Sequence, residues 1–219
     1  MPIIPKNDKD ELRRGLRRVL KRDVTLRLFT QPSSLLAIPG RDCKSCPQTQ
    51  ELLEEFVSLS PKLHLLIHDY YTEVDEREKY NVERVPAIIL GDYENAKMKY
   101  YGNPAGYEFV TILEAVKLLS RGVSPLGLAV RKSLRKVNQP VYIQVFVTPA
   151  GPQCPSVARL AHAVSMENTR ITADVIEVSE YPNLARMYNV TTVPKTIINQ
   201  LVQLSGVISE DQLTEKILK

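Results

Sequence analysis

Two cysteines separated by two residues, Cys43 and Cys46, carry the clearest chemical signal in the sequence. They open an amphipathic stretch that predicts a helix, and Pro47 suits its first turn because first-turn amides have no helical partners. A cysteine just before a helix meets unpaired amides and the positive end of the helix dipole, which favours the thiolate. Cys46 would lie one turn on and on the same side. The spacing therefore predicts a pair that can form and break a disulfide.

The charges beside this pair have both signs. Arg41 and Lys44 favour a thiolate at Cys43, whereas Asp42 opposes it. The sequence leaves the net effect on the cysteine open.

A metal clip is the alternative role for such a pair. A structural zinc site takes four ligands, commonly two further cysteines or histidines. The remaining candidates are His64, His68, His162 and Cys154, and they do not supply a second pair at finger-like spacing. We therefore expect no metal and no other cofactor.

The composition is that of an ordinary globular protein. The chain has 219 residues, of which 43% are hydrophobic and 25% charged, and a formal net charge of +4. No apolar run approaches the roughly 20 residues that cross a membrane, and the N-terminal residues lack the order of a secretory signal. Three cysteines form an odd set, which does not suit a secreted disulfide framework. We therefore expect a cytoplasmic protein.

The sequence repeats itself at half its length. Tyr80–Pro86 (YNVERVP) returns 108 residues later as Tyr188–Pro194 (YNVTTVP), and Cys46 and Cys154, each followed by proline, are separated by the same 108 residues. Glycine and proline near residue 121 interrupt the helical pattern between the copies. Two units are therefore predicted, residues 1–121 and 122–219.

Both units show the same predicted order: helix, strand, helix, strand, helix, two paired strands and a closing helix. The ranges are 8–21, 24–29, 45–59, 63–68, 73–80, 87–90, 97–101 and 106–119 in the first unit, and 126–137, 141–147, 154–166, 172–178, 181–188, 195–199, 201–205 and 210–218 in the second. This order predicts two tandem α/β units, each with a mixed central sheet flanked by helices. The first unit also has about nine additional residues, around Gln31 to Gly40.

This order of elements, with C-x-x-C at a helix N-terminus and Val-Pro about 40 residues later, resembles the thioredoxin fold. Two such units in one chain resemble the glutaredoxin-like protein disulfide oxidoreductases of thermophilic microbes. Gly102–Gly106 (GNPAG) and Tyr181-Pro182, ahead of Tyr188-Asn189, resemble further segments of that family.

The resemblance implies roles for particular residues. Cys43 is expected to be the nucleophile and Cys46 the resolving thiol. Pro86 is expected to follow a cis peptide bond, with Val85 offering its backbone to a substrate strand and Pro194 as the counterpart in the second unit. A proline that merely opens a strand is the alternative.

The second unit departs from the family pattern. The family normally carries Cys-Pro-x-Cys-Pro there, whereas this chain has Gly151 at the first cysteine position and keeps Cys154. The 108-residue offset pairs Gly151 with Cys43 and Cys154 with Cys46. We therefore predict a degenerate second site without a nucleophile, in which Cys154 is a small buried side chain. A reactive thiol at Cys154 is the alternative.

The favoured function is a thiol–disulfide oxidoreductase that acts on protein disulfides or dithiols through Cys43 and Cys46. The expected partners are proteins with disulfides or thiols, including a thioredoxin-reductase-like donor or a peroxiredoxin. A non-enzymatic binding or assembly module with vestigial or regulatory cysteines is the alternative. The helix at 8–21 is basic, but no aromatic residues interleave with its charges as stacking on bases requires. We expect those charges to be solvated, with no nucleic-acid or membrane partner.

Overall fold

The structure, a computed structural model of the chain, describes residues 3–31, 43–91 and 97–219. Apart from Gln31, the predicted insertion lies outside the described residues, as do Arg41 and Asp42. Within the described ranges, no helix is long and apolar enough to cross a membrane.

The predicted order of elements is present in both units, with ends that differ from the prediction by at most three residues. The first unit contains α1 (Lys6–Val19), β1 (Val24–Thr30), α2 (Cys46–Val57), β2 (Leu63–Asp69), α3 (Val74–Lys79), β3 (Ala87–Leu90), β4 (Met98–Tyr101) and α4 (Phe109–Arg121). The second contains α5 (Leu128–Leu134), β5 (Val141–Val147), α6 (Cys154–Ser165), β6 (Ile171–Glu177), α7 (Pro182–Met187), β7 (Lys195–Ile198), β8 (Val202–Ser205) and α8 (Glu210–Ile217).

One predicted helix begins later than expected. The stretch from residue 106 starts with a short 3-10 turn, η1 (Gly106–Glu108), and α4 follows it. Gly106 has a φ of 58°, and a Cβ there would lie 2.6 Å from the carbonyl oxygen of Pro149. The left-handed backbone of Gly106, which leaves no room for a Cβ beside Pro149, is not that of a regular α-helix, and α4 begins only after it.

The strands of the two units form a single sheet. Their order is β2-β1-β3-β4-β6-β5-β7-β8, and the units meet where β4 pairs with β6 in parallel, from Met98 opposite Ala173 to Tyr101 opposite Ile176. The α/β class and the doubled unit are confirmed, whereas the join between the two sheets was not predicted. It removes the free edge that β4 would otherwise present to solvent.

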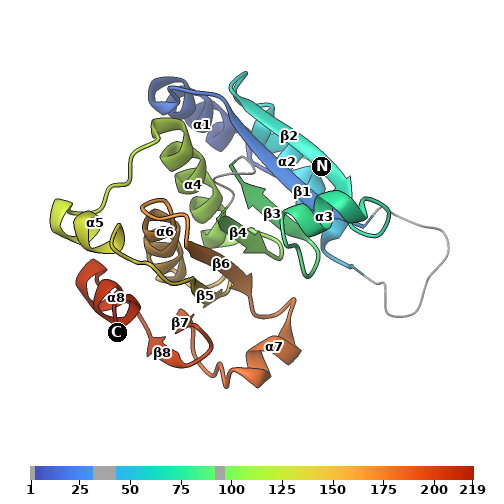
Figure 1. Cartoon of the computed structure of the whole chain (residues 1–219). Coiled ribbons are helices and arrows are strands. Elements are labelled where there is room, and N and C mark those ends of the chain that lie inside the picture. The colour runs from blue at the N-terminus through green and yellow to red at the C-terminus, as the bar shows by residue number, and fades with distance from the viewer. Residues whose placement is uncertain (1–2, 32–42, 92–96) are drawn as a thin grey trace.

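Helices cover both faces of this sheet (Figure 1). Helices α3 and α7 lie on one face, over a core built around Phe29, Tyr101 and Phe146. The other face carries the larger core, to which the remaining helices contribute, with Leu53 and Phe56 of α2 among its fully buried residues. Strands covered on both faces bury residues in both directions, and all four residues of β3 and of β4 are buried. The charged residue among them, Lys99, donates to the carbonyl oxygen of Asn81 at 2.7 Å.

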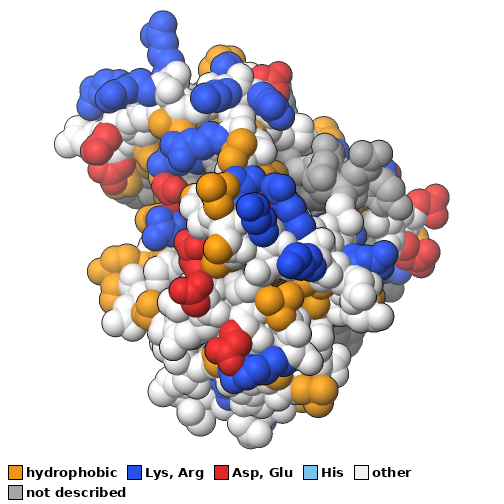
Figure 2. Space-filling view, turned by 60° about the vertical axis from the view of Figure 1, so that its left-hand side comes forward, with side chains coloured by type: hydrophobic (Ala, Val, Ile, Leu, Met, Phe, Trp, Pro, Cys, Tyr) orange, Lys and Arg blue, Asp and Glu red, His pale blue; other side chains and the backbone are white. Residues whose placement is uncertain are grey.

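Helix α1 turns Leu16 into the core and its four arginines outward, whereas Lys9 is partly buried and pairs with Glu55 of α2. Arg13, Arg14, Arg17 and Arg18 are all exposed. Figure 2 shows Lys and Arg side chains gathered at the top of the molecule, where α1 lies, with a few acidic side chains near them.

The strand directions bring both copies of the predicted site to one edge of the sheet. β1, β4, β6 and β5 run in the same direction, because β1 and β4 are both antiparallel to β3 and the other pairs are parallel. The segments that follow β1 and β5 therefore leave the sheet at the same edge. Those segments carry Cys43 and Cys46 in the first unit, and Gly151 and Cys154 in the second.

Candidate active site

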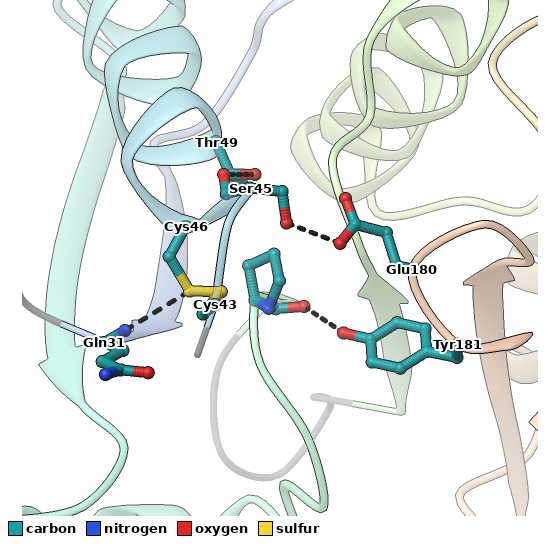
Figure 3. Close-up of a disulfide and its surroundings, with 8 residues drawn as sticks. Gln31, Cys43, Ser45, Cys46, Thr49, Glu180 and Tyr181 are labelled. Carbon is teal, nitrogen blue, oxygen red and sulfur yellow. Dashed lines mark hydrogen bonds between the residues drawn. A yellow bond between two sulfur atoms is a disulfide. The ribbon is translucent and has the colours of Figure 1, made fainter. Parts of the chain in front are cut away.

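Cys43 and Cys46 form a disulfide with a Cα–Cα separation of 5.4 Å. Cys46 is the first residue of α2 and is fully buried, whereas Cys43 lies just before the helix and is partly exposed. The Cys46 sulfur accepts a hydrogen bond from the backbone N–H of Gln31, at 3.4 Å (Figure 3). The two cysteines are therefore unequal, because Cys43 is partly exposed and Cys46 is not.

Helix α2, which carries the pair, has a hydrogen-bonded first turn and packs against α4 near its C-terminal end. In its first turn, the hydroxyl and the backbone N–H of Thr49 both donate to the carbonyl oxygen of Ser45, at 2.8 and 2.9 Å. Further along the helix, the ring of Phe56 packs edge-on against that of Phe109 in α4, with centroids 5.2 Å apart. The cysteine pair thus sits on a helix anchored in the core.

The bonds Val85–Pro86 and Val193–Pro194 are both cis. The Pro86 carbonyl oxygen accepts from the N–H of Gly102 at 3.0 Å, and that of Pro194 accepts from Gly206 at 2.8 Å. The two proline turns are therefore built alike. Among the described residues, none hydrogen-bonds to the backbone of Val85.

The second unit contributes side chains to the first unit's site. Both come from the β6–α7 loop (residues 178–181), and Figure 3 shows them beside the disulfide. The Ser45 hydroxyl donates to a carboxylate oxygen of Glu180 at 2.7 Å. The Tyr181 hydroxyl donates to the carbonyl oxygen of Pro86 at 3.2 Å. Glu180 was not among the predicted site residues, because it lies 135 positions from Ser45 in the sequence; Tyr181 entered only as part of a family-like segment.

Arg84 links this loop to the cis-proline turn. Its guanidinium lies over the rings of Tyr101 and Tyr181, at 4.8 and 5.7 Å from the centroids, and forms an ion pair with Glu83 at 2.6 Å. Stacking of a guanidinium on aromatic rings stabilises such a partly buried arrangement. The residue before Val85 is therefore fixed by contacts with both units.

The second unit repeats the frame of the site without its outer sulfur. Cys154 is the first residue of α6, as Cys46 is of α2, and it is a free, fully buried cysteine. A Cβ added to Gly151 would lie 2.5 Å from the Cys154 sulfur. Burial also raises the pKa of the Cys154 thiol. Gly151 thus lies three residues before the first residue of α6, as Cys43 lies three residues before the first residue of α2.

A buried carboxyl group lies near this second position. Glu108, from η1 of the first unit, is fully buried, and its carboxyl group accepts a hydrogen bond from the Thr111 hydroxyl at 3.0 Å. Burial raises the pKa of Glu108 to about 7. No pattern in the sequence indicated this, because an isolated glutamate ahead of an amphipathic helix is usually exposed.

The three histidines lie in three different environments. His64 is 3.5 Å from Asp23, and His68 pairs with Glu73 at 2.6 Å while its ring stacks on Phe29. His162 is fully buried, which lowers its pKa to about 4. Across the described ranges, no group of three or more His, Cys, Asp or Glu is placed to hold a metal.

The doubled sheet, the disulfide at the start of α2 and the cis-proline turn are features of the thioredoxin fold, here present in two copies. A family profile described as "Thioredoxin domain" matches residues 36–114 and, a second time, residues 141–219. The two matches span most of the chain. The chain therefore belongs to the thioredoxin-domain family, with two units in tandem.

Solved structures of similar tandem arrangement cover almost the whole chain. A protein disulfide oxidoreductase from Aeropyrum pernix is 26% identical, with a TM-score of 0.87 over 98% of this chain and 92% of that one. The N-terminal domain of the alkylhydroperoxide reductase AhpF from Enterococcus faecalis is 23% identical, with a TM-score of 0.85 over 98% and 99%. At 23% identity, the similarity to the AhpF domain shows a shared fold.

The curated relatives include a subunit of an alkyl hydroperoxide reductase and a single thioredoxin. One subunit of the alkyl hydroperoxide reductase of Escherichia coli is 23% identical over 174 residues, 80% of this chain and 32% of that protein. A thioredoxin of Methanocaldococcus jannaschii is 32% identical over 80 residues, 36% of this chain and 94% of that protein. The chain thus spans about a third of the length of the reductase protein (32%), whereas a single thioredoxin matches only 36% of this chain.

Proposed function

We propose that the chain exchanges disulfides with other proteins through Cys43 and Cys46, with Cys43 as the nucleophile and Cys46 as the resolving thiol. The observation that carries this assignment is the unequal exposure of the two cysteines at the start of α2. An accessible outer thiol can attack a partner, and a buried inner thiol reacts only with its neighbour.

The proposed reaction balances as two exchanges. In reduction of a substrate, the Cys43 thiolate attacks one substrate sulfur, which forms a mixed disulfide and releases the other substrate sulfur as a thiolate. The Cys46 thiolate then attacks the Cys43 sulfur, which closes the Cys43–Cys46 disulfide and releases the second substrate sulfur. Two electrons pass from the chain to the substrate, and the released thiolates take up protons from solvent.

We propose that substrates bind beside the cis-proline turn. The backbone of Val85 has no hydrogen-bond partner among the described residues, while Pro86 is held by Gly102 and Tyr181. An extended peptide could therefore pair with Val85 as an added strand, which would present its cysteine to Cys43.

We assign the second unit a supporting role in this reaction. The degenerate site has Gly151 at the nucleophile position and a buried thiol at Cys154, and Pro194 retains the turn. We place the boundary between the units at residue 121, where α4 ends and Gly122 takes a left-handed conformation.

The proposed partners are protein disulfides and dithiols, with a thioredoxin-reductase-like protein as electron donor and a peroxiredoxin as a client. The likeness to proteins of alkyl hydroperoxide reductases supports this choice. The proposed setting is the cytoplasm, where C-x-x-C pairs are usually catalytic or redox-sensing.

The test is turnover of a protein disulfide by the reduced chain. Cys43→Ser is expected to abolish it, and Cys46→Ser to accumulate a mixed disulfide that mass spectrometry maps to Cys43. Turnover that survives in Cys43→Ser would reject the assignment. A Cys43–Cys46 pair without a reversible couple in the range of exchange proteins, roughly −270 to −120 mV, would instead favour a non-enzymatic binding module.

A further inference from the structure

The active site of the first unit is completed by the second. Ser45, between the two cysteines, and Pro86, in the cis-proline turn, each form one hydrogen bond with the β6–α7 loop. Glu180 and Tyr181 are the residues that make these contacts, and Figure 3 shows both on the same side of the disulfide.

The loop that carries Glu180 is rigidly placed. The buried carboxylate of Glu177 accepts from the backbone N–H of Glu180 at 2.9 Å and from that of Ser179 at 3.1 Å. On the first unit's side, Gly102 has a φ of 107°, and a Cβ there would lie 2.7 Å from the Cβ of Glu177 and 3.2 Å from the Cγ of Glu180. The close approach of the two units thus fixes Glu180 against the first unit's site.

Glu180 brings its carboxylate to the N-terminus of α2. Ser45 is the N-cap of this helix, but its side chain makes no capping hydrogen bond and donates to Glu180 instead. The positive end of a helix dipole stabilises one nearby negative charge, and here two groups would share it: the Glu180 carboxylate and a thiolate at Cys43. Like charges at one position oppose each other.

We propose that Glu180 of the second unit opposes the thiolate of Cys43 and thereby makes the reduced Cys43–Cys46 pair a stronger electron donor. This inference rests on the proposed function, because it concerns the same pair.

The electron and proton balance of the reduction shows in which direction Glu180 shifts the redox equilibrium. Reduction of the disulfide breaks the sulfur–sulfur bond with two electrons from a dithiol. Cys46 ends as a thiol, and Cys43 ends as a thiolate or, with a second proton, as a thiol. A carboxylate that destabilises the thiolate raises the free energy of the reduced form relative to the disulfide. The pair then passes its electrons on more readily.

Other charged groups surround the pair and do not take the place of Glu180. Lys44 lies between the cysteines and is exposed, and Arg84 is held by Glu83 and two tyrosine rings. The carboxylate of Glu177 is occupied by the loop itself. Arg41 and Asp42 adjoin Cys43 in the sequence, outside the described residues.

The test compares the full chain with Glu180→Gln, which removes the charge and keeps an oxygen that can accept from Ser45. Two quantities are measured: the pKa of the Cys43 thiol, from the pH dependence of its alkylation in the reduced protein, and the equilibrium constant with dithiothreitol. We expect the thiol pKa to fall by about one unit. At a pH above the thiol pKa of both proteins, we expect the equilibrium to shift about tenfold toward the reduced pair.

Two further variants separate charge from structure. Glu54→Gln makes the same change on an exposed part of α2, about 12 Å along the helix from Cys46, and is expected to match the unaltered chain. Ser45→Ala removes the hydrogen bond to the carboxylate and is expected to shift both quantities in the same direction by a smaller factor.

The possible results distinguish failure of this inference from failure of the proposed function. The inference is overturned if the thiol pKa and the equilibrium constant of Glu180→Gln equal those of the unaltered chain, or if the thiol pKa rises. In either case, a reversible Cys43–Cys46 couple would still support the proposed function. An unchanged Ser45→Ala protein overturns the role of the Ser45 contact. A chain without a reversible couple overturns both proposals.

Discussion

Restoring a cysteine at position 151 tests whether the second site is a true copy of the first. A Cβ at Gly151 would lie 2.5 Å from the Cys154 sulfur and 3.2 Å from the Cγ2 of Thr148. Across a normal disulfide, bond lengths place the Cβ of one cysteine about 3 Å from the sulfur of the other. A shift of roughly half an ångström at the Cys154 sulfur, within reach of a small side-chain rotation, would therefore allow Gly151→Cys to close a disulfide.

The size of the effect follows from the length of the closed loop. A cross-link between positions 151 and 154 encloses four residues, for which the chain-entropy relation gives about 2 kcal/mol at 25 °C. In a domain of this size, each kcal/mol changes the melting temperature by about 2 to 4 °C. Gly151→Cys is therefore expected to melt about 4 to 8 °C above the unaltered chain under oxidising conditions, and to lose this gain when reduced.

Thiol counting in denaturant provides the direct assay. After mild oxidation the unaltered chain should show one free thiol, that of Cys154, and Gly151→Cys should show none. The double variant Gly151→Cys with Cys154→Ser is the control, and it should show one. Two free thiols in Gly151→Cys would refute the reasoning, because Gly151 would then not occupy the position that corresponds to Cys43.

Three further changes probe the buried polar groups. Since the pKa of Glu108 rises from 4.5 to about 7 on folding, the folded chain holds a proton there that the unfolded chain has lost; stability should fall by about 3 kcal/mol as pH rises through this window. Glu108→Gln should remove that slope in urea titrations. Tyr142→Phe deletes a 2.6 Å hydrogen bond to buried Asp174 and should cost about 1 to 3 kcal/mol by the same method. Cys154→Ser should leave protein disulfide turnover within about twofold; a large loss would contradict a supporting role for the second site.

The order of elements was predictable because the chain contains two copies of the same unit, and each copy supports the interpretation of the other. The YNV-x-x-VP segments recur at one offset, and the structure places each between a short helix and a strand. Asn81 and Asn189 both adopt positive φ, at 48° and 50°, and both proline bonds that follow are cis. Positive φ angles and cis-proline bonds depend on a few neighbouring residues, and such local features can be predicted from the sequence.

The join between the units was not predictable in the same way. Met98–Tyr101 is a four-residue strand with a lysine at position 99, and its sequence suits an edge strand packed on one face as well as a central strand. Its partner, β6, lies about 70 residues further on. Glu180 reaches Ser45 only because of this pairing, so no spacing within the first unit indicates it.

The pairing of β4 with β6 also explains what the second unit contributes if, as proposed, Gly151 leaves it without a nucleophile. The loop after β6 supplies Glu180 and Tyr181 to the first site, whereas η1, which follows β4, brings Glu108 toward the second. These contributions come from the ends of the joined strands and not from the missing sulfur at position 151. On the proposed function, a glycine at position 151 leaves the second site unable to exchange disulfides, yet the strand and loop that contact the first site are intact. We therefore expect the second unit to act on the first site through this loop.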